Sequence, residues 1–252
     1  MDFLTKIMTE KKLEVEKMLK EELQPLRKTE SFYNRVKSCP QHVHIIGEVK
    51  RASPSKGTIN ESVDILAQAK AYQKAGVSAI SVLTDEVFFK GSIEDLRKIA
   101  KEVEVPVLCK DFIIAEKQLI RARNAGATIV LLIVAALSQE KLQELYHQAE
   151  ALGLEILVEV HDEKELKIAE ALGAKLIGVN NRNLKTFVVD IEVSRKLGEK
   201  QETESVYISE SGFSTGTQVN SLKNDYQAVL VGEALMISGN PEAKVKELQV
   251  VR

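Results

Sequence analysis

Eight short apolar runs recur between residues 44 and 232, and this repeat constrains the fold more than any other feature. Each run is rich in Val, Ile and Leu and has the length of a β-strand. Nearly continuous hydrophobicity is typical of parallel strands that are buried on both faces. The predicted strands cover residues 44–50, 77–83, 105–110, 128–134, 154–160, 175–180, 206–210 and 227–232.

Stretches with helical periodicity separate most of these strands. They are predicted over residues 63–75, 92–103, 116–124, 139–152, 163–172, 191–197 and 214–223, and several end in a glycine that leads into the next strand. Strands alternating with helices indicate a parallel sheet covered by helices. Eight such units in 252 residues favour a single-domain (β/α)8 TIM barrel of the α/β class over an open doubly wound sheet. No G-x-G-x-x-G or Walker motif follows the first strand, which also disfavours the open sheet.

The first 42 residues precede the repeat and are predicted to form a helical N-terminal extension of the one domain, which spans residues 1–252. Apolar residues from Phe3 to Leu23 fall near helical spacing, so a helix is expected over residues 2–24, ending before Pro25. A second short helix is expected over residues 31–38. The expected role of this extension is to cover apolar surface of the barrel.

Composition and charge exclude several classes of protein. The chain has 35 Lys and Arg against 37 Asp and Glu, and the two signs are interspersed, so nucleic acid is not an expected partner. The two cysteines, Cys39 and Cys109, do not suggest a disulfide framework, and a cytoplasmic location is expected. Charges interrupt the N-terminus and no apolar run is long enough to cross a bilayer, so neither a signal peptide nor a membrane is expected. The oligomeric state is left open, with a monomer favoured.

Charged residues stand at the ends of three predicted strands, where TIM barrels build their active sites. Glu48 and Lys50 end the first strand, Lys110 ends the third and Glu159 lies at the end of the fifth. An isolated Glu-x-Lys is more often a structural ion pair, but Lys and Glu are rarely buried unless paired or functional. The convergence of these four side chains predicts a site for general acid–base catalysis. Opposite charges in this partly desolvated mouth are expected to hold each other ionised, and neighbouring like charges to lower a lysine pKa toward neutral pH.

A phosphate site is predicted beside this cluster. Ser211 and Gly212 follow the seventh strand and Gly232 ends the eighth, and the loops after these strands bind phosphate in many TIM barrels. Glycine lets the backbone approach an anion closely. A single small residue at a strand end is more often only a tight turn, whereas small residues after two adjacent strands make an anion site about as frequent as a turn. Ser53, after the first strand, is expected to reach the same region because closing the barrel makes the first and eighth strands neighbours.

A metal site is not expected. Two of the four histidines, His42 and His44, lie at the amino end of the first strand, and no Asp/His cluster follows the strands. Cys109 precedes Lys110 in one strand and therefore points to the opposite face, toward the helices. This position disfavours a cysteine nucleophile.

Eight segments, taken in chain order, carry the motifs of one known family. They are Glu48-Val-Lys50-Arg-Ala-Ser53-Pro-Ser-Lys-Gly57, Leu83-Thr-Asp85, Phe89-x-Gly91, Cys109-Lys110-Asp111-Phe112-Ile113, Leu157-Val-Glu159-Val-His, Gly178-Val-Asn180-Asn-Arg182-Asn-Leu184, Ser209-Glu210-Ser211-Gly212 and Val231-Gly232-Glu-Ala-Leu-Met236. Over about residues 44–240 the chain resembles the indole-3-glycerol-phosphate synthases, which also carry a helical N-terminal extension. The resemblance implies a carboxy-lyase of tryptophan biosynthesis that needs neither cofactor nor metal. Such an enzyme converts 1-(2-carboxyphenylamino)-1-deoxyribulose 5-phosphate to indole-3-glycerol phosphate, releasing carbon dioxide and water.

The resemblance also implies roles for individual residues. Lys110 is expected to be the general acid for ring closure, and Glu159 and Glu48 the carboxylates for dehydration. Lys50 is expected to be a second acid or the partner of the substrate carboxylate, and which lysine and glutamate act in dehydration is left open. The expected substrate-binding residues are Asn180 and Arg182 for positioning and charge balance, Ser53, Ser211, Gly212 and Gly232 for phosphate, and Phe89, Phe112, Leu131 and Leu184 for the apolar walls around the aromatic ring.

Other functions fit parts of the same pattern. A ribulose-phosphate epimerase would need metal-ligating histidines at strand ends, and a phosphoribosylanthranilate isomerase would not require two lysines and two glutamates. A Schiff-base aldolase would use Lys110 as a nucleophile. A non-catalytic barrel would not require charged strand ends.

Overall fold

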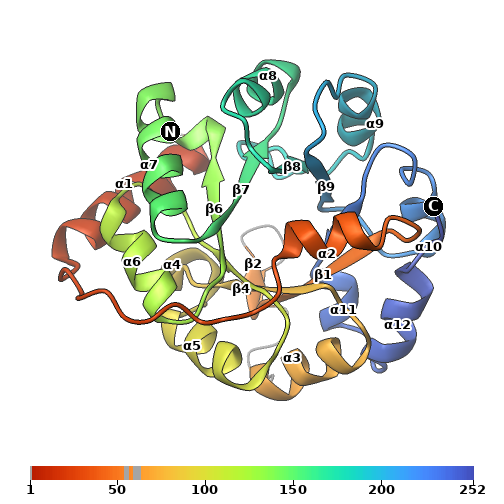
Figure 1. The fold of residues 1–252 in the computed structure, drawn as a ribbon, viewed down its shortest axis with the longest axis horizontal. Helices are drawn as coiled ribbons and strands as arrows, with labels where there is room; N and C mark the ends of the chain where they lie inside the picture. Colours follow the sequence, from red (N-terminus) through yellow and green to blue (C-terminus); the bar gives the residue numbers. More distant parts are fainter. Residues whose placement is uncertain (1, 54–56, 59–63) are drawn as a thin grey trace.

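The barrel is a closed ring of parallel strands. A computed structural model describes residues 2–53, 57–58 and 64–252, without the side chains of residues 53, 57 and 58. Its main sheet closes in the order β1-β10-β9-β8-β7-β6-β5-β4 (Figure 1). Strand β1 pairs with both β10 and β4, so this sheet has no free edge. The predicted TIM barrel is confirmed.

Each barrel strand lies within a predicted apolar run and differs from it by at most two residues at either end. The strands are β1 (His44–Val49), β4 (Ala79–Leu83), β5 (Val107–Lys110), β6 (Ile129–Ile133), β7 (Glu155–Val160), β8 (Leu176–Asn180), β9 (Val206–Glu210) and β10 (Ala228–Val231). A small antiparallel hairpin of β2 (Ala52–Ser53) and β3 (Gly57–Thr58) follows β1.

All seven helices predicted between the strands are present, and the described residues form three further helices around the barrel. The predicted helices are α3 (Ile65–Lys74), α5 (Ile93–Glu102), α6 (Glu116–Asn124), α7 (Gln139–Ala151), α8 (Glu163–Ala171), α9 (Glu192–Gly198) and α10 (Gly216–Asn220), the last shorter than expected. The additions are α4 (Glu86–Phe89), α11 (Glu233–Met236) and α12 (Pro241–Leu248), besides a single 3₁₀ turn, η1 (Val134–Ala136). Helix α12 carries start signals that sequence reasoning could have used, an Asn240 N-cap followed by a proline in the first turn.

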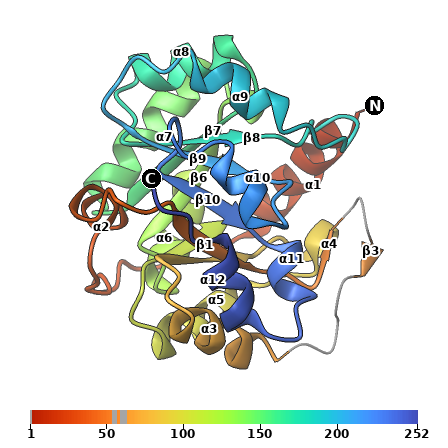
Figure 2. The ribbon, with the colours of Figure 1, turned by 90° about the vertical axis from the view of Figure 1, so that its right-hand side faces the viewer.

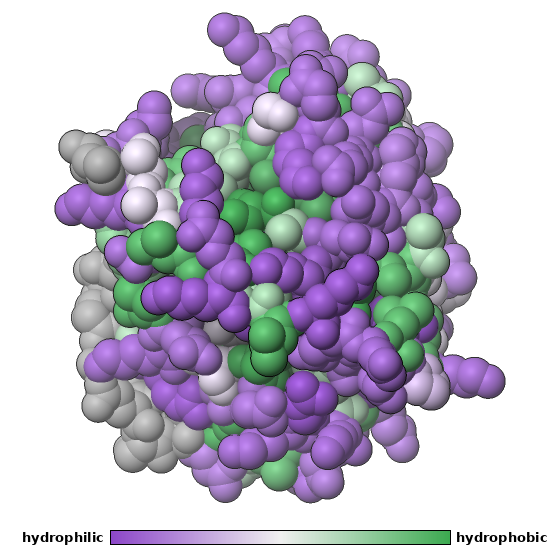
Figure 3. Space-filling view, turned by 90° about the vertical axis from the view of Figure 1, so that its left-hand side faces the viewer, coloured by the Kyte–Doolittle hydropathy of each residue, from purple (hydrophilic) through white to green (hydrophobic). Residues whose placement is uncertain are grey.

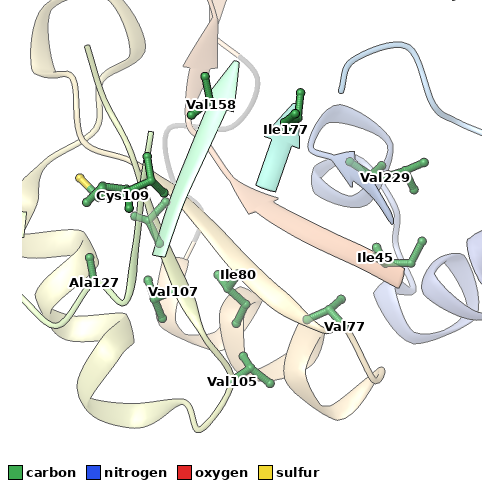
Figure 4. Packing of buried hydrophobic residues seen from close by; sticks show 14 of the residues in the cluster. Ile45, Val77, Ile80, Val105, Val107, Cys109, Ala127, Val158, Ile177 and Val229 are labelled. Atoms are coloured by element: carbon green, nitrogen blue, oxygen red, sulfur yellow. The ribbon is translucent and has the colours of Figure 1, made fainter. Parts of the chain in front are cut away.

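Strand parity divides the buried residues into two cores. Successive side chains of a strand point to opposite faces. In β5, Val107 and Cys109 pack outward against the helices, whereas Leu108 belongs to the core inside the barrel. Figure 4 shows part of the outer core, with Cys109 among aliphatic side chains of several strands. The predicted outward direction of Cys109 is confirmed. Inward residues at the strand ends therefore face the mouth of the barrel.

The first helix is shorter than predicted. Helix α1 covers Phe3–Lys17, and residues 18–31, called here the strap, contain no regular structure. The predicted helix to residue 24 is wrong because side chains of the α6 region take the strap's backbone carbonyls. Lys117 Nζ donates to the carbonyl of Met18, and Asn124 donates to that of Glu22. These bonds hold the backbone away from the helical path.

The apolar residues that suggested a longer helix are left in solvent. Leu19 is 84% exposed and Leu23 is 54% exposed, so the apolar periodicity continues past Lys17 without a surface to bury it. On the face that carries α1 and the strap, hydrophobic surface lies between hydrophilic side chains (Figure 3).

Helix α2 (Phe32–Ser38), confirmed as predicted, closes the amino end of the barrel. Phe32 and Val36 are buried in the inner core. The Glu155 carboxylate, at the start of β7, accepts hydrogen bonds from Ser31 Oγ and from the backbone amides of Phe32 and Tyr33 at 2.7–2.9 Å. A carboxylate at this helix N-terminus satisfies otherwise unpaired amides and matches the helix dipole.

Helix α1 lies at the opposite end of the barrel (Figure 2). The Nζ atom of Lys11 is 2.7 Å from Asp111 Oδ1, 3.0 Å from Asp85 Oδ2 and 2.6 Å from Glu14 Oε2, and this lysine is 1% exposed. Ile7 is buried in the inner core. The extension thus covers apolar surface as expected, and a buried ionic cluster fixes it over the mouth.

Replacing Lys11 by Met should destabilise the protein by about 3 kcal/mol, because Asp85 and Asp111 would lose a buried counter-charge. Urea unfolding at neutral pH measures this change. Lys12→Met, at an exposed neighbour on the same helix, is the matched control and should stay within about 0.5 kcal/mol of the parent. Equal stability of the two variants would contradict the role assigned to Lys11.

Candidate active site

Two adjoining pockets occupy the barrel mouth. The first lies under α1 and the second between the loops after β8, β9 and β10. Both are lined by Glu48, Lys50, Lys110, Asn180, Arg182, Phe187 and Ser211, which therefore form the boundary between them. The four predicted catalytic residues all line the first pocket, and their catalytic roles stay predictions.

Lys110 lies at the centre of the charged part of the site. Its Nζ is 3.0 Å from Glu159 Oε2 and 3.3 Å from Glu210 Oε2. The side chains of the two glutamates are 1–2% exposed, whereas the lysine side chain is 14% exposed and reaches the pocket. The three residues end or nearly end β5, β7 and β9, and strand parity turns them all inward.

Glu48 and Lys50 form the second pair. Lys50 Nζ is 2.7 Å from Glu48 Oε1, so the i, i+2 spacing does place both side chains on one face. A Cβ atom at Gly232 would lie 2.8 Å from Lys50 Nζ and would also collide with Glu48 Oε1. The absence of a side chain at Gly232 therefore makes room for this ion pair, whether or not an anion also binds there.

The carboxylates around Lys110 keep it charged. Burial acts to lower the pKa of Lys110, but the neighbouring carboxylates, Glu159 above all, outweigh burial and raise it above the usual range. The expected lowering of a lysine pKa is not what Lys110 experiences, because its charged neighbours within ion-pair distance are acids. A lysine held as the cation can donate a proton but is a poor nucleophile.

The three buried glutamates of the site are not equivalent. Burial acts to raise the pKa of each, but Lys50 and Lys110 hold that of Glu48 below its ordinary value, and Lys110 and His161 do the same for Glu159. Burial raises the pKa of Glu210 to about 7, since the attraction of Lys110 is partly cancelled by repulsion from Glu159. Carboxyl groups with separated pKa values can serve as base and acid in the same pocket.

Glu210 is not among the residues predicted to form the site. It ends β9, and the Gly178 backbone on β8 gives it space, since a Cβ at Gly178 would collide with Glu210 Oε1. The signal was available: like Lys110 it is a charged residue at the last position of a predicted strand. Sequence reasoning selected the small residues after it and passed over the carboxylate.

Asn180, Arg182 and Ser211 are tied together at the boundary of the pockets. Asn180 Oδ1 accepts hydrogen bonds from Ser211 Oγ and from the backbone amide of Arg182, both at 3.0 Å. The guanidinium of Arg182 donates to the carbonyl of Phe187 at 3.2 Å. These bonds fix the loop after β8 against the end of β9, with polar groups turned toward the pockets.

Apolar side chains form the far wall of the first pocket. Phe89, Phe112, Leu131 and Leu184 all line it, and the rings of Phe89 and Phe112 lie 6.3 Å apart. Further lining comes from residues that were not predicted, Phe3, Leu4 and Ile7 of α1, and Phe187. No sequence signal linked α1 to the pocket, because its residues are separated from the barrel strands by the strap.

The second pocket has a volume of about 700 Å³ and contains most of the predicted phosphate residues. Ser211, Gly212 and Gly232 line it, together with Ser214 and Lys244. The predicted role of the Ser53 side chain lies outside the described part of the structure. The loops after β9 and β10 line one pocket, as the barrel topology predicts.

The described residues contain neither a metal-binding cluster nor a membrane-spanning helix. Among residues 2–53, 57–58 and 64–252, no group of three or more His, Cys, Asp and Glu side chains is placed to hold a metal ion. None of the described helices has the length and apolar character required to span a membrane.

Comparison with known proteins identifies the family. The family model described as indole-3-glycerol phosphate synthase matches residues 4–248. The chain belongs to the indole-3-glycerol phosphate synthase family. An indole-3-glycerol phosphate synthase of Listeria welshimeri is 60% identical over 252 residues, covering 100% of both chains. That of Streptococcus gordonii is 52% identical, covering 99% of this chain and 98% of its own.

A solved structure with low sequence identity shares the barrel. The crystal structure of a 3-hexulose-6-phosphate synthase superimposes with a TM-score of 0.65 over 82% of this chain and 98% of its own, at 16% identity. At that identity the likeness shows the fold alone. Membership of the indole-3-glycerol phosphate synthase family, by contrast, rests on nearly the whole sequence.

The pKa of Glu210 predicts how stability depends on pH. The folded chain keeps the Glu210 proton up to about pH 7, whereas the unfolded chain releases it near its ordinary value of about 4.3. Between these values the unfolded state binds fewer protons, so this group makes the fold less stable as pH rises. Relative to the parent, Glu210→Gln should therefore gain about 1–3 kcal/mol between pH 5 and pH 7 in urea unfolding. Glu144→Gln, on the exposed surface of α7, should show no such gain, and equal behaviour of the two variants would contradict the shift.

Proposed function

We propose that the two pockets bind 1-(2-carboxyphenylamino)-1-deoxyribulose 5-phosphate and convert it to indole-3-glycerol phosphate, the reaction of the family to which the chain belongs. The observation that carries this proposal is the position of Lys110. This cation lies between buried carboxylates where an apolar pocket meets a second pocket lined by glycine and serine. A substrate with an aromatic ring at one end and a phosphate at the other fits that division.

The apolar pocket suits the carboxyphenyl ring. Phe89 and Phe112 offer ring faces and edges, and Leu131 and Leu184 complete the wall. The phosphate is proposed to bind at the far end of the second pocket, near Ser211, Gly212 and Gly232, with Ser53 as a further ligand. This orientation would place the ketose carbons over the charged boundary.

Ring closure requires an acid at the ketone oxygen. As the ring carbon that bears the carboxylate attacks the carbonyl carbon, the carbon–oxygen π electrons move to oxygen, and Lys110 is proposed to supply the proton. The raised pKa of Lys110 supports this role because the acid must hold its proton until negative charge develops on that oxygen. The same cation would stabilise the developing charge. Loss of carbon dioxide then returns the electron pair to the ring.

Dehydration requires an acid for the departing hydroxyl and a base for the proton on the adjacent ring carbon. Glu159 and Glu48 are the proposed carboxylates, and because neighbouring lysines hold both ionised, each is suited to accept the ring proton as the base. Lys50 is proposed either as the second acid or as the partner of the substrate carboxylate. Asn180 and Arg182 would orient the substrate at the boundary between the pockets.

The Schiff-base alternative is disfavoured by charge. An aldolase lysine must be a neutral amine to attack a carbonyl, whereas the acids around Lys110 keep its ammonium charged. Sodium borohydride added with substrate should therefore leave no covalent adduct on Lys110, and a mass increase on that residue would support the alternative.

The direct test is to incubate the purified chain with the carboxyphenylamino substrate and follow the fluorescence of the indole product. We expect stoichiometric release of carbon dioxide together with indole-3-glycerol phosphate. A folded protein that forms no indole would overturn the proposed function. A cytoplasmic location, a monomeric state and a single-domain organisation accompany this proposal as predictions.

Lys110→Ala should lower kcat by about 10²- to 10⁴-fold, the contribution of a positioned general acid. Circular dichroism should show an unchanged fold. The control is Lys141→Ala on α7, which removes another ion-paired lysine, at a site remote from the pockets, and should leave kcat unchanged. A near-parental rate for Lys110→Ala would remove Lys110 from the mechanism.

A further inference from the structure

A histidine lies behind the proposed base Glu159, on the side away from Lys110. Strand parity turns Glu159 and His161 to the same side of the chain at the end of β7, and His161 Nε2 is 3.3 Å from Glu159 Oε1. The other oxygen of Glu159, Oε2, is the one that faces Lys110 at 3.0 Å. Each oxygen of this buried carboxylate therefore has its own cationic or potentially cationic partner.

Glu165 on α8 holds the histidine in place. One oxygen of Glu165, Oε2, accepts a hydrogen bond from the backbone amide of His161 at 2.8 Å and lies 3.1 Å from His161 Nδ1. Glu165 is itself fixed in the first turn of α8, where its amide donates to the N-cap residue Asp162. The ring orientation of His161 is thus set from outside the barrel.

The two ring nitrogens of His161 both face carboxylates. Nδ1 faces Glu165 from α8 and Nε2 faces Glu159 from β7, while Lys110 of β5 lies beyond Glu159. Nδ1 is within hydrogen-bond distance of Glu165, whereas the buried Nε2 makes no hydrogen bond and lies at ion-pair distance from Glu159. A neutral imidazole would place a lone pair beside one of these acids, whereas the imidazolium places positive charge beside both. Burial acts to lower the pKa of His161, but the two carboxylates outweigh burial and raise it to about 10.

The reaction makes a second cation necessary. Once Lys110 has given its proton to the substrate it is neutral, and Glu159 keeps the Coulombic support of only one neighbour. Glu159 is 1% exposed, and Glu210 is a second carboxylate beside the same lysine. Without the charge of Lys110, Glu159 would then tend to take up a proton and could not act as a base. His161 is placed to prevent this protonation without touching the substrate, since it is absent from the lining of both pockets.

We propose that His161, held by Glu165, is a positioning residue that keeps Glu159 ionised and oriented after Lys110 has donated its proton. This inference rests on the proposed function, in which Glu159 is a base. It adds a residue pair outside the pockets to the machinery of the reaction. The order of exposure fits the arrangement, rising from 1% for Glu159 to 15% and 17% for the side chains of His161 and Glu165.

The first experiment compares pH profiles of His161→Gln and the parent. The variant should lose about ten- to a hundredfold in kcat with little change in KM, less than the loss expected for Lys110→Ala. The acidic limb of its kcat profile should move up by about one pH unit or more. Glu165→Gln should change the profile in the same direction by a smaller amount. A profile of His161→Gln that coincides with that of the parent would overturn the proposal.

A matched control is available on α7. His147 also lies beside a glutamate, with Nδ1 3.3 Å from Glu150 Oε2, but it is exposed and remote from the pockets. His147→Gln should leave both kcat and the pH profile unchanged. A shift of the profile in His147→Gln equal to that in His161→Gln would show that the effect is not specific to Glu159.

The second experiment does not depend on turnover or on a variant that folds. Nuclear magnetic resonance of the ¹⁵N-histidine-labelled parent should show both ring nitrogens of His161 protonated at pH 8, with assignment from the His161→Gln spectrum or from through-bond correlations. A neutral ring at that pH would refute the proposal even if the chain is an active synthase. Conversely, an unchanged rate for Glu159→Gln would refute the role of Glu159 in the proposed function while leaving the charge of His161 measurable.

Discussion

The closed parallel barrel allows each strand to send only alternate side chains inward, and the site depends on this constraint. The innermost positions of the strands are filled by Leu108, Leu157 and Ile208, which pack the barrel core. Two residues further along the same strands stand Lys110, Glu159 and Glu210. A change of parity in any of these strands would turn its charge toward the helices and remove it from the mouth.

Charges that are buried together in this way must be neutralised by opposite charges, and the structure supplies ion pairs that do so. Lys110 lies among acids, and Glu159 lies between Lys110 and His161. A separate cluster around Lys11 joins α1 to Asp85 and Asp111, the residue next to Lys110. The helix that supplies part of the apolar wall is therefore held by ionic contacts one residue away from the proposed acid. The covering of the pocket by α1 and the placement of Lys110 therefore both depend on the region around Asp111.

Much of the fold could be predicted because the signals are local. Apolar runs and helix-ending glycines such as Gly76 and Gly126, with φ of +89° and +100°, mark the units of the barrel. The end of α1 could not be predicted, because it depends on bonds from Lys117 and Asn124, about a hundred residues away in the chain.

The residues of the site also divide into those that the sequence could predict and those that it could not. Glu48, Lys50, Lys110 and Glu159 were recognisable as charges at strand ends, and all four do line one pocket. Which carboxyl keeps its proton was not recognisable, since this follows from distances among three strands. The inclusion of Phe3 and Ile7 in the pocket depends on how the strap returns α1 to the mouth, and sequence patterns carry no record of that path.

The positions of α1 and α2 at opposite ends of the barrel have a consequence for the order in which parts of the protein fold. Helices α1 and α2 are synthesised before the barrel strands, yet α2 is capped by Glu155, 123 residues beyond Phe32, and Lys11 has partners as far along as Asp111. Until those residues have been synthesised, the apolar faces of Phe32 and Val36 have no barrel to enter. The two ends of the barrel are therefore closed by helices that are synthesised before its walls and dock only after the walls have formed.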